Sequence, residues 1–598
     1  WMTVMTRSSA NITMGGENIY TFQNYHKHTY HTNPVIADSV TSNEDYAKRA
    51  AELGHGIISI MEHGWQGRYI EGYELAEKYG LKFVMGAEAY WVKDRTEKDG
   101  TNGHIYLGAK NENGRQCLND VLAEANISGF YRRPRVDVPL LLSLPAEDII
   151  VTTACLAYWQ YEDVDDITLR LRDHFKENFF LEVQYHNVEK QRRINEHVLA
   201  LSKKYAIPLI MGCDSHYILP ADAQERSDYI KSKGIDYPDE DGFVLDYPDG
   251  DEAYRRFAQQ CVLSHSDIVE AMENTNVFLK VEDYDNACFT KDIKMPSLHP
   301  DWTQDQKDAE YDRVIWEAWG VEKQKIPCEN WPHYKDEISK EMDIVHQTKH
   351  ADYFLDDKAI VERGRELGGV LTKTGRGSAV SFYTNKLLGL TDVDRIAAKV
   401  KMYPERFMSP TRILQAKTLA DVDLNVADRD PFLQAQKDIM GPESSYEMIA
   451  YGTLKPKAAW KMYAKSQGVD FDLANEVSDQ IERYENALKH AGEEEKDDID
   501  VLDYIDPQYR DLFQQSGKYQ GIISHMTPHP CATLLYQGNI RREIGLIRLK
   551  DKICCVMDGL WAEQYKFLKN DWLKVSVVEL ISKVYKRIGI PWSSEQEL

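Results

Sequence analysis

Two aspartates that stand one residue apart, in the segment TLADVDLNVADRD, are the first candidates for chemistry. In an extended strand residues i and i+2 point to the same face, so Asp421 and Asp423 would share one face. The opposite face would carry buried Ala420, Val422 and Leu424. A solvated strand face explains so short a motif without any function. The alternative is a divalent cation held between the carboxylates, the usual means of orienting phosphate chemistry.

A second set of candidates lies in the first 220 residues, where histidines, carboxylates and a cysteine stand at the ends of apolar runs. The motifs are H-K-H, E-H-G, G-A-E-A-Y, G-H-I-Y, T-A-C-L and D-S-H, which supply His26, His28, His63, Glu88, His104, Cys155, Asp214 and His216. Taken singly, each is typical of a structural residue. Together they predict one clustered metal site, and imidazole, carboxylate and thiolate suit zinc, manganese or iron better than calcium or magnesium.

A glycine-rich turn, TKTGRGSAVSF, follows an apolar run and precedes a helix that we expect to begin near Ser378. Backbone N–H groups of such a turn, a helix N-terminus and Arg376 could together hold a triphosphate. A structural turn is equally compatible with G-x-G, and no G-K-[ST] follows. Downstream, KNDWLKV places Lys569 and Asp571 two residues apart on one strand face, which suits a triphosphate beside a metal ion.

A basic helix is predicted at YGTLKPKAAWKMYAK, which concentrates Lys455, Lys457, Lys461 and Lys465 in an acidic protein. It is a candidate for contact with duplex phosphates, and a solvated amphipathic helix is the alternative.

The helices and strands that must position these residues are predicted from the periodicity of the apolar residues. Residues 20–220 alternate helical stretches with short apolar runs, a βαβ pattern that predicts parallel strands with polar residues at their ends. Residues 221–350 read as helical and acidic, 351–445 as mixed, the stretch up to 518 as helical and 519–598 as mixed.

Composition limits the function classes. The length of 598 residues predicts roughly three to five domains, and the formal net charge of −25 argues against coating of nucleic acid by bulk attraction. The nine cysteines form no C-x-x-C pair, which favours a reducing compartment, the cytoplasm. No apolar run approaches the roughly 20 residues that span a bilayer, so no membrane partner is expected.

The order of the first motifs resembles the polymerase and histidinol phosphatase (PHP) domain over about residues 22–225. The resemblance implies a distorted barrel of strands and helices that holds up to three ions, Zn²⁺ or Mn²⁺, and hydrolyses phosphodiesters. It adds Asp38 to the eight ligands named above. Glu62 stands where the family commonly has aspartate.

The later motifs TGRGSAVSF, YPERFMSP, ADVDLNV, YGTLKPKAAWK, SHMTPHPCATLL and KNDWLKV resemble, in order, the bacterial DNA polymerase III alpha subunits, the family C replicative polymerases. That resemblance implies an α/β multidomain chain in which a PHP barrel precedes an α+β, nucleotidyltransferase-like palm with a helical thumb insertion. Asp421, Asp423 and Asp571 would hold two Mg²⁺ ions. Arg376, Gly377, Ser378 and Lys569 would contact the incoming dNTP, and Lys455, Lys457 and Lys461 the primer–template DNA.

The resemblance also sets expected boundaries: a leader at 1–19, the PHP domain and joining region at 20–285, the first palm segment at 286–445, the thumb at 446–518 and the second palm segment at 519–598. The family continues into fingers, clamp-binding and OB regions. We therefore expect a fragment or one half of a split polymerase, from a bacterial or phage-infected cell, with a second polypeptide that supplies those parts and reaches the sliding clamp. The PHP domain could act as a 3′–5′ exonuclease. The alternatives are a stand-alone metal-dependent nuclease and a replication scaffold without catalysis.

Overall fold

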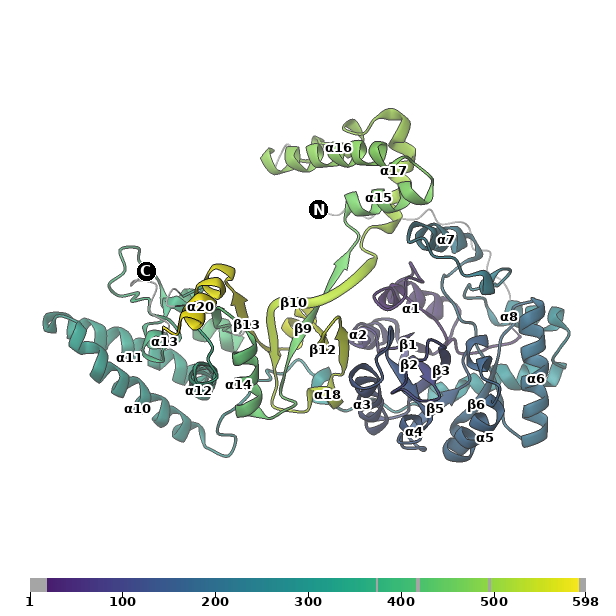
Figure 1. Cartoon of the computed structure of the whole chain (residues 1–598), viewed down its shortest axis with the longest axis horizontal. Helices are drawn as coiled ribbons and strands as arrows, with labels where there is room; N and C mark the ends of the chain where they lie inside the picture. The colour runs from purple at the N-terminus through teal and green to yellow at the C-terminus, as the bar shows by residue number, and fades with distance from the viewer. Residues whose placement is uncertain (1–18, 373–374, 416–419, 493–495, 591–598) are drawn as a thin grey trace. The chain divides into compact units, whose positions relative to one another are not determined.

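The computed structural model describes residues 19–372, 375–415, 420–492 and 496–590, and the chain divides into two compact units (Figure 1). Unit 1 comprises Trp1–Gly114, Asp137–Asp283 and Leu454–Ile522. Unit 2 comprises Arg115–Val136, Tyr284–Thr453 and Ile523–Leu598. Each unit is therefore assembled from segments far apart in the sequence.

The division into two units does not test the domain boundaries expected from the sequence, which therefore stay predictions. Residues 1–18 of the expected leader, and Lys373 and Thr374 of the glycine-rich turn, lie outside the described residues. Among the residues that are described, no helix combines the length and the apolar character needed to cross a membrane.

The sheet of unit 1 runs in the order β1-β2-β3-β5-β6-β7. Its strands are β1 (Ile57–His63), β2 (Lys82–Val92), β3 (Gly103–Ala109), β5 (Ile149–Thr152), β6 (Phe179–Val183) and β7 (Leu209–Met211). The pairs β1–β2, β5–β6 and β6–β7 are parallel as predicted, but β3 runs antiparallel to both of its neighbours. The expectation of uniformly parallel strands was wrong for β3, because side-chain alternation carries no information about strand direction.

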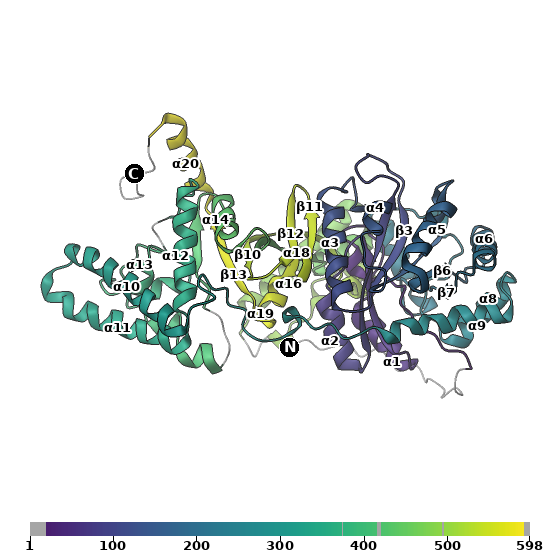
Figure 2. The same ribbon diagram turned by 90° about the horizontal axis from the view of Figure 1, so that it is seen from below.

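Helices lie against this sheet; α5 and α6, for example, pack against β6 (Figure 2). Those of unit 1 are α1 (Asn43–Glu52), α2 (Tyr69–Tyr79), α4 (Val138–Leu141), α5 (Val164–Phe175), α6 (Glu189–Tyr205), α7 (Ala223–Ser232), α8 (Gly250–Gln260), α9 (His265–Asn274), α15 (Pro456–Ser466), α16 (Phe471–His490) and α17 (Arg510–Ser516). Helix α3 (Glu112–Ile127) and strand β4 (Arg135–Asp137) span a boundary between the units. Local signals explain several ends: Ser42 and Asp45 form a capping box before α1, and Gly80 ends α2 in the left-handed conformation.

The sheet of unit 2 runs in the order β11-β12-β9-β10-β13-β8. Its strands are β8 (Asp423–Val426), β9 (Ser445–Thr453), β10 (Ile523–Leu535), β11 (Leu546–Leu549), β12 (Lys552–Asp558) and β13 (Leu568–Lys574). Its helices are α10 (Gln304–Glu322), α11 (Trp331–Thr348), α12 (Ala351–Glu366), α13 (Tyr383–Leu387), α14 (Asp430–Met440), α18 (Ile540–Glu543), α19 (Gly559–Gln564) and α20 (Ser576–Ile588). Strands β8 and β13 are parallel neighbours although nearly 150 residues separate them in the chain.

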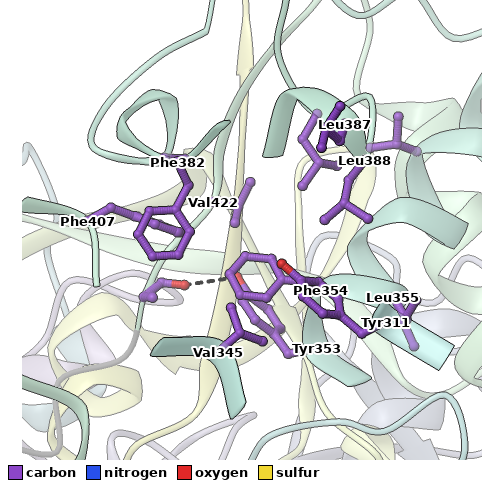
Figure 3. Close-up of a cluster of buried hydrophobic side chains, with 14 of the residues drawn as sticks. Tyr311, Val345, Tyr353, Phe354, Leu355, Phe382, Leu387, Leu388, Phe407 and Val422 are labelled. Atoms are coloured by element: carbon purple, nitrogen blue, oxygen red, sulfur yellow. Dashed lines mark hydrogen bonds between the residues drawn. The ribbon is translucent and has the colours of Figure 1, made fainter. Parts of the chain in front are cut away.

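An apolar core holds the helices of unit 2 to β8 (Figure 3). Phe354 of α12, Phe382 and Phe407 pack there with Val422, and all four are at most 3% exposed. Full burial of such a side chain stabilises the fold by about 1.5–3 kcal/mol. The hydroxyl of Tyr353 donates to the Ala420 carbonyl at 2.9 Å, which ties α12 to the segment just before Asp421.

The helix expected to begin near Ser378 begins five residues later, at Tyr383, and is short. A 3-10 turn at Ala379–Ser381 leads into α13, which has only five residues. Because the macrodipole of so short a helix is small, it adds little to any binding of phosphate by the preceding turn.

Candidate functional sites

All nine predicted metal ligands gather at one edge of the unit 1 sheet. The carboxyl ends of the parallel strands meet there, and since β3 runs the other way, it contributes His104 from near its start. Lys27 pairs with Ser215 in a parallel bridge. Neighbours of a bridged residue point to the opposite face of the strand from that residue, so one face carries four side chains: His26, His28, Asp214 and His216.

The ligand atoms form three overlapping groups, within each of which all atoms lie within 4.8 Å of one another: His26, His28 and Asp214; His63, Glu88 and His104; and His28, His63 and His216. In the first group Oδ1 of Asp214 lies 3.3 Å from Nε2 of both histidines. In the second, Glu88 Oε2 lies 2.7 Å from His63 Nδ1 and Glu88 Oε1 lies 3.2 Å from His104 Nδ1.

The two remaining ligands complete the cluster. Asp38 Oδ2 lies 2.7 Å from His216 Nε2 and 3.3 Å from His63 Nε2, and Cys155 Sγ lies 3.3 Å from His104 Nδ1. Arg226 contacts the other oxygen of Asp38 at 2.5 Å through Nη2. The sequence analysis did not identify Arg226 as a partner of this ligand.

Orphaned polar atoms indicate that metal ions fit this cluster. Nε2 of His26, Nε2 of His28, Nδ1 of His63 and both carboxylate oxygens of Glu88 are buried. They lie close to neighbouring ligand atoms, as the distances above show, but among the described residues none of them meets hydrogen-bond geometry. Leaving such groups unpaired costs about 1–3 kcal/mol each. A bound cation would satisfy all of them at once, and the mixed N, O and S donor set suits Zn²⁺ or Mn²⁺.

The charge states of two of the ligands, His28 and Glu88, fit metal binding. Burial and the neighbouring His63 lower the pKa of His28 to about 3, so its imidazole is neutral, the form that coordinates metals. Although burial opposes it, His104 and His63 hold the pKa of Glu88 well below its usual range. Burial, reinforced by Glu88 and Asp214, raises the pKa of the Cys155 thiol, which only a bound cation would offset.

Glu182 of β6 is a functional candidate that the sequence analysis missed. Its Oε1 lies 2.6 Å from Nδ1 of His26, and its Oε2 accepts from Tyr25 at 2.5 Å and from Thr152 at 2.8 Å. A proton held on Nδ1 by this carboxylate leaves the lone pair of Nε2 directed at the ion site. A charged residue inside the fully buried run FFLEV was the available signal.

The three predicted palm aspartates also come together. Asp423 and Asp571 are register partners on β8 and β13. Lys569 Nζ lies 3.1 Å from Asp421 Oδ2 and 3.4 Å from Asp571 Oδ2. The predicted alternation holds, since Ala420, Val422 and Leu424 are at most 5% exposed while the aspartates face the other side.

The glycine-rich turn reaches the same carboxylates. Arg376 Nε lies 3.9 Å from Asp423 Oδ2. Gly377 has φ +63°, and a Cβ atom there would lie 2.5 Å from Asp423 Oδ2, so only glycine permits this approach. Arg376 and Gly377 are exposed and Ser378 is half-buried.

Divalent cations fit the palm cluster as well. Oδ1 of Asp571 is buried without a hydrogen-bond partner in the described part of the chain. Burial raises the pKa of Asp421, against the pull of Lys569, and burial followed by Asp571 raises that of Asp423. Carboxylates crowded in this way favour a cation between them, and an oxygen-only donor set suits Mg²⁺.

Two further features beside the aspartates were not predicted. Asp357 of α12 lies behind the site, with Oδ1 3.5 Å from Nδ2 of Asn570, and burial raises its pKa to about 7. His529 and Cys531 lie within ligand distance of Asp571. However, Nδ1 of His529 accepts from the backbone N–H of Ala532 at 2.8 Å, so that nitrogen is already engaged by the bulge in β10. No short-range spacing signals Asp357, whereas H-P-C sets His529 and Cys531 two residues apart and was a signal that the sequence analysis did not use.

The predicted DNA-binding lysines divide into two kinds. Lys455 and Lys461 are exposed. Lys457 instead faces α16, with Nζ 2.8 Å from Glu482 Oε2 and 3.7 Å from Glu485 Oε2. Its charge is thus largely neutralised within the fold.

Two family models match separate parts of this chain. Residues 26–186 match the PHP domain, and residues 313–574 match the bacterial DNA polymerase III alpha NTPase domain. DNA polymerase III subunit alpha of Borreliella burgdorferi is 25% identical over 577 residues, which cover 90% of this chain and 48% of that protein. The Aquifex aeolicus protein of the same name is 23% identical over 91% of the chain and 50% of its own length, and that of Campylobacter jejuni 23% over 95% and 50%.

The chain thus spans about half the length of these relatives. The fold class expected from the sequence, a PHP domain followed by a family C palm, is confirmed. The chain thus resembles the bacterial DNA polymerase III alpha subunits in two matched parts, a PHP domain followed by the NTPase domain.

Proposed function

We propose that unit 2 carries the palm of a DNA-directed DNA polymerase, in which Asp421, Asp423 and Asp571 hold two Mg²⁺ ions. The observation that supports this most is the convergence of the three carboxylates from β13 and from the segment entering β8, with Lys569 between two of them. Such ions would lower the pKa of a primer 3′-hydroxyl and stabilise the pyrophosphate that leaves the dNTP.

The protein's own groups have separable roles in this proposal. Lys569 offsets part of the repulsion between Asp421 and Asp571 before substrate binds, and it can then contact a triphosphate. Arg376 is exposed at the turn beside Asp423, where a guanidinium can bind two phosphate oxygens. Gly377 lets this turn approach the carboxylate closely.

Primer extension by the complete polymerase assembly tests the palm. Asp421→Asn and Asp571→Asn should each abolish extension, because one oxygen of each ion site becomes a neutral amide. Asp428→Asn, an exposed aspartate just beyond β8, should extend normally. Extension that survives in Asp421→Asn would overturn the assignment.

We propose a second activity for unit 1, hydrolysis of phosphodiesters at DNA 3′ ends by the PHP cluster loaded with Zn²⁺ or Mn²⁺. The nine clustered ligands and their orphaned atoms support it. His26, His28 and Asp214 would hold an ion, and Glu182 would keep His26 in the coordinating tautomer. The ions would supply an activated water and bind the departing oxygen.

Degradation of single-stranded DNA from its 3′ end tests this second activity. His28→Ala should remove it and leave primer extension intact, because the palm uses other ligands. A chelator should also remove the degradation, but it takes Mg²⁺ from the palm as well. Metal analysis of the purified chain separates the nuclease from a scaffold, since a scaffold needs no transition metal. Three expectations from the sequence stay predictions: a second polypeptide that supplies the remaining polymerase regions, contact with the sliding clamp through that polypeptide, and a cytoplasmic location.

A further inference from the structure

Three lysines from two distant parts of the chain gather on unit 1, where α7 packs against α15 (Figure 1). The seam between these helices is apolar. Tyr229 of α7 shares a buried cluster with Ala459 and Met462 of α15. The lysines lie beside this seam.

Helix geometry separates the faces of α15. Trp460 and Ala464 pack in the cluster with α16 and α17, and Ala459 and Met462 face α7. Lys461 and Lys465 stand four residues apart on the remaining face, about 6 Å along the axis, and both are exposed.

Lys233 extends this face from the other helix. It directly follows α7 as the C-cap residue, and its Nζ lies 5.2 Å from the centre of the Tyr229 ring. Burial and the nearby charge of Lys465 lower the pKa of Lys233, as expected when two ammonium groups face each other without an anion between them.

The acidic residues around the seam do not neutralise these lysines. Asp228 is buried and accepts from Gln467 at 3.0 Å and from Gln224 at 3.1 Å. Glu225 pairs with Lys518 at 3.1 Å. Across the described ranges, Lys233, Lys461 and Lys465 form no ion pair with an acidic side chain.

We propose that Lys233, Lys461 and Lys465 form a phosphate-binding row for the backbone of duplex DNA, so that a residue of the PHP half acts together with the basic helix. The proposal rests on the polymerase function proposed above and names part of its DNA path. The chain has a net charge of −25, so acidic side chains are abundant, yet these three ammonium groups form no ion pair in the described residues. Neighbouring positive charges of this kind favour the binding of a polyanion. Lysine contacts to phosphate carry no base preference.

The salt dependence of DNA affinity tests the row. The probe is a primer–template duplex with a recessed 3′ end, titrated by fluorescence anisotropy between about 50 and 200 mM salt. Each phosphate contact contributes about −0.9 to the slope of log K against log salt. Lys233→Met and Lys465→Met keep the aliphatic stems, and each should reduce the steepness by about one unit and weaken affinity severalfold at low salt.

Matched variants make the result specific. Lys204→Met removes an exposed lysine of α6 and should leave affinity and slope unchanged. Lys465→Arg should restore both. An unchanged slope in Lys233→Met would overturn the row, whereas loss of extension in Asp421→Asn would still support the polymerase. Absence of duplex binding by the unmodified chain would overturn the row as well.

Discussion

Glu182 makes three short contacts, and one of its partners, His26, is a proposed metal ligand. Glu182→Gln should weaken Zn²⁺ or Mn²⁺ binding by about 10- to 100-fold, because a neutral amide oxygen stabilises the proton on Nδ1 less than a carboxylate does. Metal competition against a chelating dye measures this effect. Glu62→Gln is the matched control, since Glu62 is equally buried in the same sheet but accepts from Thr29. If both variants lose metal affinity equally, the loss comes from removing a buried charge and not from the contact between Glu182 and His26.

Gly377 supports a second prediction at the residue scale. Gly377→Ala should lower primer extension by at least about tenfold, because the methyl group must displace the Asp423 carboxylate, and small displacements of catalytic groups cost up to about 10² in rate. Gly368→Ala is the control. Gly368 also has a positive φ, +86°, but no atom lies within 4 Å of its Cβ position. If both variants lose activity equally, backbone strain and not the contact is responsible.

Some of the residues that the sequence analysis found are visible in short spacing, whereas His63, Glu88, His104 and Cys155 stand singly at the ends of apolar runs and Asp38 came from the resemblance alone. H-K-H and D-V-D place two ligands on one strand face whatever the rest of the fold does. Glu182 acts through His26, 156 residues away, and Lys457 is neutralised by Glu482, 25 residues away. Contacts of this kind depend on tertiary packing, which local periodicity does not encode.

At the scale of single elements, α12 carries buried carboxyl groups against the palm. Burial, reinforced by Asp352 and Asp357, raises the pKa of Asp356 to about 9. In the unfolded chain this group titrates near pH 4, so above that pH the folded state binds more protons and stability falls, by about 1.4 kcal/mol per pH unit, until the folded value is passed.

Asp356→Asn should therefore raise the free energy of unfolding at pH 8 and change it little at pH 4. Denaturant unfolding at the two pH values measures the difference. A variant that is no more stable than the parent at pH 8 would show that this carboxyl is charged at little cost in the folded state.

Elements were predicted where their signal is periodic and local. The strand expected around Asp421 and Asp423 is present but begins only at Asp423, and the basic helix is present from Pro456, just after Lys455. The reversed direction of β3 and the shortness of α13 were not predicted. Strand direction is decided by pairing between distant segments. Helix α13 ends at Leu387, just before Gly389, which has φ +77° and reverses the chain.

At the scale of the whole molecule, residues 454–522 form an insertion between two strands that pair with each other. Thr453 of β9 and Ile523 of β10 are register partners, and Leu454 N–H donates to the Ile522 carbonyl at 2.9 Å. A two-residue Asn-Gly turn can therefore close the hairpin in place of the insertion.

The chain that carries this replacement should keep the metal content of the PHP cluster and lose most of its affinity for duplex DNA. The ligands lie outside 454–522, whereas Lys461 and Lys465 lie within it. Metal analysis and the anisotropy titration provide the two readouts. Unchanged duplex affinity would place the main DNA contacts elsewhere in the chain.

The interleaving of the two units also governs the order in which a ribosome can complete them. Unit 1 takes its last segment from Leu454–Ile522, so roughly 240 residues are synthesised after Asp283 before that unit is whole. At about 5–20 residues per second this delay lasts roughly 10–50 seconds. During that time Tyr229 lacks two of the residues that bury it, Ala459 and Met462. The nascent protein therefore exposes an apolar patch that a chaperone can occupy until the insertion emerges.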